Sequence, residues 1–218
     1  IDQIMSKPSI FIRSFAMGDL RQIKSVFRFL ARRFVALVFV MLGSATPLYA
    51  ASQSNIATGA WVGDPAYGEV RLVSAVSGMG NLEELPLGLE FRLAPGWKIY
   101  WRTPGESGLP PMLELQLASD HSVTSDIHWP VPKRFDTFGF DNFGYDNTVI
   151  LPVTVEGHPK GAAVQIIGQM KALACADICV PLAGKVQLNI ADGPAIASRY
   201  AMEIARSKAK VPRSSGAS

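Results

Sequence analysis

Residues 85–93 have the sequence LPLGLEFRL, and this stretch decides the expected fold. From residue 87 onward, leucine or phenylalanine at each odd position alternates with glycine or a charged residue at each even position. This period of two is typical of a strand that buries one face. A Pro95-Gly96 turn follows, and residues 97–101, WKIYW, form the next expected strand.

Similar patterns extend along the chain on both sides of this stretch. They predict further short strands at 69–76, 113–117, 127–129, 148–155, 164–173 and 180–190. A proline- and glycine-rich loop, 103–111, and an aromatic, glycine-broken loop, 135–145, are expected between them. No stretch between the strands has the pattern of a crossover helix, so the sequence predicts an all-β antiparallel sandwich.

The pattern divides the chain into four segments. Residues 1–50 form a targeting segment, 51–66 a polar, flexible lead, 67–192 the sandwich, and 193–218 a helix followed by a linker-like tail. The helix is expected from Ala195 to about Ala209, because apolar residues recur four positions apart there, at 196, 200 and 204.

The N-terminal segment carries most of the positive charge. Residues 1–50 hold seven of the 21 Lys/Arg and two of the 18 Asp/Glu, so the rest of the chain is near −2. Arg28, Arg32 and Arg33 precede an apolar stretch, 34–42, and small residues lead to Ala50. This order predicts a secretory signal cleaved after Ala50 and therefore a periplasmic protein, with an uncleaved membrane anchor as the alternative.

Two further expectations follow from the same segment and from the remaining charge. Met5 and Met17 are candidate start residues, because the chain begins with Ile1. The body of the chain has no stripe of Lys or Arg, so no nucleic-acid partner is expected.

The chain has two cysteines, Cys175 and Cys179, within ALACADICVP at residues 172–181. In an extended strand their Cα atoms would lie about 13 Å apart, whereas a disulfide needs roughly 4.4–6.8 Å. The chain must therefore turn within residues 176–178 if the two sulfurs are to join. Export makes such a bond chemically feasible.

Three interpretations of this cysteine pair remain open. A structural disulfide would close a ring of only five residues and stabilise the fold by about 2 kcal/mol. Two thiolates could instead bind Cu(I), although His121, His128 and His158 have no ligand spacing to the pair. The third interpretation is a dithiol that exchanges with a partner protein, and it needs no cofactor. No Lys, Arg or His lies within three residues of either cysteine, so neither thiol is expected to be strongly activated.

Several motifs together carry a resemblance that covers residues 69–190. They are PGWKIYWRTPGESGLPP at 95–111, WPVP at 129–132, FGY at 143–145, LPV at 151–153 and CADICVP at 175–181. In this order they resemble the N-terminal periplasmic domain of the DsbD/ScsB thiol:disulfide interchange proteins. The resemblance implies an immunoglobulin-like sandwich whose Cys175 and Cys179 pass electrons to periplasmic thioredoxin-fold proteins. It also implies links to cytochrome assembly and copper tolerance.

The resemblance also implies an aromatic cap loop that shields the cysteines until a partner binds. Residues 136–139 match this loop, with Asp136 in it and Phe138 as the shielding ring, and Tyr100 resembles an aromatic residue near the same pair. The alternative is that Phe138 and its aromatic neighbours are ordinary core or surface residues.

Two departures from the family pattern affect these expectations. DsbD has five residues between its cysteines and this chain has three, which favours the ScsB-like branch. The membrane domain that supplies electrons and the thioredoxin-like domain are absent, so the chain is expected to be truncated or a free-standing relay. The alternative function is a non-catalytic sandwich that handles copper or binds a partner and keeps a structural disulfide.

Overall fold

The computed structural model describes residues 57–119, 122–137 and 139–213. The predicted signal segment, the first part of the flexible lead and Phe138 lie outside these residues. No helix among the described residues is long and apolar enough to cross a membrane.

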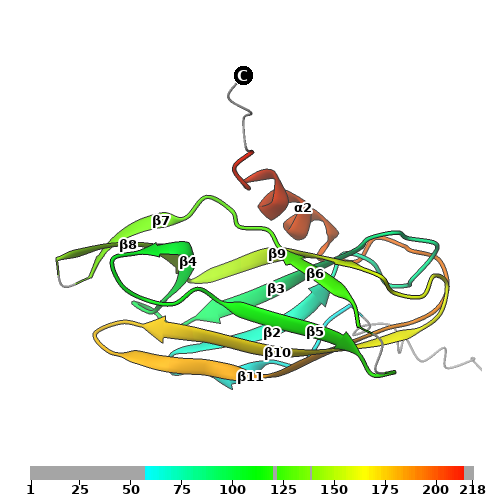
Figure 1. The fold of residues 1–218 in the computed structure, drawn as a ribbon, viewed down its shortest axis with the longest axis horizontal. Coiled ribbons are helices and arrows are strands. Elements are labelled where there is room, and N and C mark those ends of the chain that lie inside the picture. Colours follow the sequence, from blue (N-terminus) through cyan, green and yellow to red (C-terminus); the bar gives the residue numbers. More distant parts are fainter. Residues whose placement is uncertain (1–56, 120–121, 138, 214–218) are drawn as a thin grey trace, which may run out of the picture. The chain divides into compact units, whose positions relative to one another are not determined.

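Two antiparallel β-sheets and one short helix, α2 (Ala201–Ala209), form the regular structure of the described part of the chain (Figure 1). The first sheet has the order β1-β2-β3-β9-β6, and the second has the order β11-β10-β4-β8-β7, with β5 pairing β10. The strands are β1 Val62–Asp64, β2 Gly68–Ser74, β3 Leu85–Leu93, β4 Lys98–Gly105, β5 Met112–Leu117, β6 Thr124–Ile127, β7 Lys133–Thr137, β8 Phe140–Asp146, β9 Thr148–Glu156, β10 Val164–Cys175 and β11 Cys179–Ile190. The prediction of an immunoglobulin-like, all-β antiparallel sandwich is confirmed.

Strand β3 is central to the first sheet and pairs with both β2 and β9. Its Leu87, Leu89 and Phe91 are completely buried in a core that also takes Ile166, Val186 and other residues of the second sheet. Burying each large apolar side chain contributes about 1.5–3 kcal/mol. The alternation in residues 85–93 therefore marks the strand that holds the two sheets together.

The predicted loop at 135–145 is wrong, because these residues lie mostly in a hairpin formed by β7 and β8. Gly139 has a φ of 84°, which a glycine adopts without strain, and it lies in the hairpin turn. Gly144 lies inside β8, where an added Cβ would come within 2.1 Å of the Ile99 carbonyl oxygen. The glycines thus permit the turn and a close strand contact and do not break the strands.

The described part of the expected flexible lead also contains regular structure. Residues 62–64 form β1, which pairs with the start of β2. Next to it, the Trp61 ring lies 4.1 Å from the Arg71 guanidinium carbon and 4.4 Å from that of Arg92. Cation–π contacts of this kind fix the segment against the first sheet.

The predicted helix begins later than expected, since α2 spans Ala201–Ala209. The preceding residues are held by the end of the first sheet: the Ser77 amide donates to the Ile196 carbonyl, at 2.9 Å, and the Ser198 amide donates to the Ala75 carbonyl, at 2.8 Å. Ile204 on α2 is buried, whereas Ile196 is 62% exposed. Pairing with the sheet has therefore replaced the first expected helical turns.

Candidate redox site

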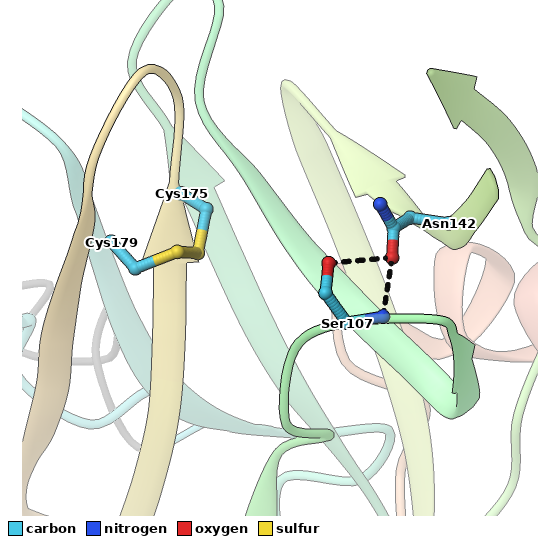
Figure 2. The surroundings of a disulfide bond; sticks show 4 residues. All are labelled: Ser107, Asn142, Cys175 and Cys179. Carbon is cyan, nitrogen blue, oxygen red and sulfur yellow. Dashed lines mark hydrogen bonds between the residues drawn. A yellow bond between two sulfur atoms is a disulfide. The ribbon is translucent and has the colours of Figure 1, made fainter. Parts of the chain in front are cut away.

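The two cysteines close the end of a long hairpin made by β10 and β11. All twelve residues of β10 pair with β11, and the last pair is Cys175 with Cys179. Residues 176–178 form the turn, in which the Ala176 amide donates to the Ile178 carbonyl, at 2.9 Å. A disulfide joins the cysteines and their Cα atoms are 4.1 Å apart (Figure 2). The chain therefore makes the tight turn that a bond between these residues requires.

The two sulfur-bearing residues differ in exposure. Cys175 is completely buried, whereas Cys179 is exposed at the end of the hairpin and the neighbouring Ile178 is 66% exposed. Ala174 belongs to the central core, but Cys175 does not. Because successive residues of a strand face opposite sides of a sheet, Cys175 lies on the outer face of the second sheet and is covered locally.

Strand β4 carries the side chains that lie beside Cys175 on this outer face. Lys98 is its partner in the register between β4 and β10, and opposite residues of an antiparallel pair place their side chains on the same face. Tyr100, two residues further, is only 2% exposed and also lies outside the central core. The structure therefore brings Tyr100 to the face of the sheet that bears Cys175.

The loop after β4 covers Tyr100. An added Cβ at Gly108 would lie 2.4 Å from the Tyr100 ring, so the glycine backbone packs directly on it. Ser107 hydrogen-bonds the Tyr100 hydroxyl, which lowers the pKa of that hydroxyl, but burial has the larger effect and raises it overall. Tyr100 is therefore a neutral, enclosed ring at neutral pH.

A buried amide, Asn142 on β8, anchors the same loop. Its Oδ1 accepts hydrogen bonds from the Ser107 amide, at 3.1 Å, and from Ser107 Oγ, at 2.9 Å. Its Nδ2 donates to the Phe140 carbonyl, at 3.2 Å, and Asn142 is completely buried. Figure 2 shows the two bonds to Ser107 in the surroundings of the disulfide. Asn142 thus ties the loop over Tyr100 to the β7–β8 hairpin.

Asp136, in the expected cap, lies beside the disulfide turn. It lines a cavity of about 500 Å³ together with residues 95–98 and 176–178. The Gly139 amide donates to Asp136 Oδ1, at 3.1 Å, so this carboxylate shapes the turn of the β7–β8 hairpin. Phe138, the proposed shielding ring, lies outside the described residues.

Lys98 is the residue that sequence reasoning missed. It is 77 positions before Cys175, and only the pairing of β4 with β10 places the two opposite each other. Its Nζ lies 5.3 Å from the centre of the Phe135 ring on β7. A cation therefore lies between the disulfide hairpin and the cap hairpin. Motifs near the cysteines give no sign of Lys98, and sequence analysis could find it only by predicting which strands are neighbours in the sheet.

The described residues include no group of three or more His, Cys, Asp or Glu side chains arranged to hold a metal ion. Two of the three histidines are described, and both lie next to strands of the first sheet. His128 Nε2 is 2.7 Å from Thr154 Oγ1, and His158 follows β9. Neither is near the cysteines in the sheet order.

Comparisons with known proteins agree with this architecture. Residues 73–191 match the model of the family described as "Thiol:disulfide interchange protein DsbD, N-terminal". The crystal structure of the N-terminal periplasmic domain of ScsB from Proteus mirabilis is 31% identical with a TM-score of 0.57. That match covers 75% of this chain, which spans 62% of the ScsB domain.

The reduced N-terminal domain of DsbD from Neisseria meningitidis is a more distant match. It is 11% identical with a TM-score of 0.34, and the match covers 60% of this chain and 90% of that domain. No curated protein sequence is significantly similar to this chain.

Proposed function

Because the chain belongs to the family of the N-terminal domain of the thiol:disulfide interchange protein DsbD, we propose that it is an electron relay. In this role Cys175 and Cys179 alternate between a disulfide and two thiols, and they pass the electrons to thioredoxin-fold partners. The observation that supports this proposal best is the position of the disulfide at the end of a hairpin, with Cys179 exposed.

The difference in exposure supports different roles for the two sulfurs. A thiolate of an electron donor reaches Cys179 Sγ more easily than the buried Cys175. Attack forms a bond between the donor sulfur and Cys179 Sγ and breaks the bond to Cys175, which leaves as a thiolate. A second donor thiolate then attacks the donor sulfur of this mixed disulfide and releases Cys179. The donor is oxidised and the domain gains two electrons and, at neutral pH, two protons.

The reduced domain then reverses these steps with an oxidised partner. Cys179 attacks the partner disulfide, and Cys175 resolves the mixed intermediate. A partner must reach the turn at residues 176–178, whose Ile178 is exposed and apolar.

The cap hypothesis extends this function. Asp136 places the β7–β8 turn beside the disulfide turn, and Phe138 follows it by two residues. We assign Phe138 the role of shielding the cysteine pair from small thiols and oxidants, with Tyr100 as a buried aromatic residue on the same face of the sheet as Cys175. A partner would displace the cap hairpin before exchange.

The compartment and the electron source belong to the same proposal. The ScsB domain that is 31% identical is periplasmic, and residues 28–50 have the order of charged, apolar and small residues found in secretory signals. We therefore place the domain in the periplasm, where a membrane electron-transfer domain of the DsbD/ScsB type supplies electrons.

Trapping a mixed disulfide tests this function directly. The Cys175→Ser variant keeps the exposed thiol but lacks the resolving one, so it should accumulate a mixed disulfide with an oxidised periplasmic thioredoxin-fold protein. The matched Cys179→Ser variant should accumulate much less. Equal, negligible trapping by both variants, together with a reduction potential below about −300 mV, would instead identify a structural disulfide.

A further inference from the structure

Reduction of this disulfide creates an electrostatic problem at Cys175. If Cys179 is the sulfur that is attacked, Cys175 is the leaving group and carries the first negative charge. Cys175 is completely buried in the oxidised protein. Burial disfavours an anion and raises the pKa of a thiol unless a cation or a hydrogen-bond donor is close. The structure should therefore supply such a group on the outer face of the second sheet.

Lys98 meets this requirement by its position. It is directly opposite Cys175 in the register of β4 with β10, and Cβ atoms of opposite residues are about 4.5–5.5 Å apart. Lys98 also lines the cavity that residues 176–178 of the disulfide turn line. The long, flexible lysine side chain can bring its ammonium group to Cys175 Sγ from this position.

Three acidic residues of the described part of the chain lie near Lys98 or the disulfide turn, and their positions reduce their influence. Asp146 is opposite Lys98 on the other side of β4, but its Oδ1 lies 2.5 Å from Lys133 Nζ and is already paired. Asp136 and Asp177 are exposed to solvent at the cavity. Water screens such exposed charges, whereas a partly buried charge acts more strongly.

Tyr100 is a further titratable group on this face, two residues from Lys98 on β4. Its hydroxyl is neutral at neutral pH, because burial raises its pKa. It can contribute a hydrogen-bond donor but no charge. Lys98 contributes a cation to the row of paired residues that runs from Cys179 through Cys175 to β4.

We propose that Lys98 stabilises the thiolate that leaves at Cys175 when Cys179 is attacked. This inference rests on the proposed electron-relay function. No proton moves in the step: the donor thiolate loses its charge as it bonds to Cys179, the S–S bond breaks, and the electron pair of that bond stays on Cys175 beside the ammonium group. The lysine lowers the energy of the leaving group, which speeds the exchange.

In the oxidised protein the same ammonium group has a second contact. Lys98 Nζ lies 5.3 Å from the centre of the Phe135 ring on the cap hairpin. This cation–π contact keeps the charge near the site while no thiolate is present. When Cys175 becomes negative, the stronger charge–charge attraction draws Lys98 toward the sulfur and weakens its contact with the cap hairpin.

The pKa of Cys175 tests the inference without any partner protein. In a Cys179→Ser background, Cys175 is the remaining thiol, and its ionisation can be followed by thiolate absorbance near 240 nm. Lys98→Met should raise the pKa of Cys175 by about one unit or more, since an opposite charge within ~4–6 Å shifts a pKa by about 1–3 units. Lys98→Arg should restore most of the effect.

Lys171→Met is the matched control. Lys171 is exposed on the same strand and the same face, four residues from Cys175 or about 13 Å along the strand. The Lys171→Met substitution removes the same charge but should leave the pKa of Cys175 nearly unchanged. Equal values for the Lys98→Met and Lys171→Met variants would overturn the inference. If Lys98→Met proves too unstable to titrate, Lys98→Gln provides the same comparison.

A second measurement separates this inference from the proposed function. In the protein with both cysteines, Lys98→Met should slow reduction of the disulfide by dithiothreitol about three- to tenfold, because a leaving thiolate of higher pKa departs more slowly. An unchanged rate and pKa, with normal trapping of a partner by Cys175→Ser, would remove only the role of Lys98. A shifted pKa without any trapping would remove the relay function instead.

Discussion

Replacing Asn142 with alanine is expected to lower the free energy of unfolding by about 2–3 kcal/mol. The completely buried side chain makes three hydrogen bonds, two accepted from Ser107 and one donated to the Phe140 carbonyl. Each such bond contributes about 0.5–1.5 kcal/mol net, and the small space left by the amide adds to the loss. Because Ser107 is exposed, its amide regains water when the bond is lost, which keeps the estimate at the lower end.

Urea unfolding measures this change in the free energy of unfolding. In thermal unfolding, the same change should lower the midpoint by roughly 4–12 °C. Asn189→Ala is the control, because Asn189 is exposed on β11. A second assay locates the effect. Amide hydrogen exchange in residues 103–111 should accelerate about tenfold for each 1.4 kcal/mol of local stability lost.

Two results would refute the reasoning about Asn142. One is a free energy of unfolding within about 0.5 kcal/mol of the Asn189→Ala control, the usual range for neutral surface changes. The other is a loss of stability without faster exchange in residues 103–111, since the loop over Tyr100 would then not depend on Asn142.

Three further predictions concern the surroundings of the disulfide. Replacing Phe138 with alanine should speed oxidation of the reduced pair by a bulky non-partner oxidant, and an unchanged rate measured by thiol titration would argue against the shield. Gly108→Ala should cost at least about 2 kcal/mol in urea unfolding, because the φ is 98° and the new Cβ would lie 2.4 Å from the Tyr100 ring. Gly96→Ala is its control, with a φ of 83° but no atom within 4 Å of the new Cβ, and a similar cost in both would mean that the ring contact is unimportant. Burial raises the pKa values of Tyr100 and Tyr145 in the folded protein, so the stability that these two groups contribute is complete below pH 10 and declines above it. Between pH 8 and 11, the free energy of unfolding should therefore fall less in the Tyr145→Phe variant than in the unchanged protein. Identical slopes of free energy against pH would contradict this.

Most strands could be predicted because their apolar residues alternate with polar ones, as expected for a strand that buries one face. Residues 85–93 show this best, since the expected strand and β3 have the same bounds. The hairpin at 133–146 escaped prediction because a glycine that accommodates a neighbouring backbone, such as Gly144, looks like a strand breaker in a single sequence. Helix α2 starts late for a similar reason: hydrogen bonds of residues 196–198 to the sheet outweigh a helical pattern.

The site was predictable only in part. The cysteine pair and its turn are local in sequence, so a disulfide between residues of this spacing requires the bend at residues 176–178. The charge beside them is not local. Lys98 lies opposite Cys175 because of the order β11-β10-β4, which depends on how the whole sheet assembles. The expectation that no cation lies beside the thiols therefore considered only the residues next to the cysteines in the sequence.

The cysteines close a covalent ring of just five residues at the end of β10 and β11, which pair along their full length. Opening so small a ring releases little chain entropy, and hydrogen bonds along the ribbon remain to hold both thiols in place. The fold should therefore survive both oxidation states with almost the same backbone. In the proposed relay, such a domain would pass between its disulfide and dithiol states without refolding, and the hairpin would keep the two thiols close enough to join again after each cycle.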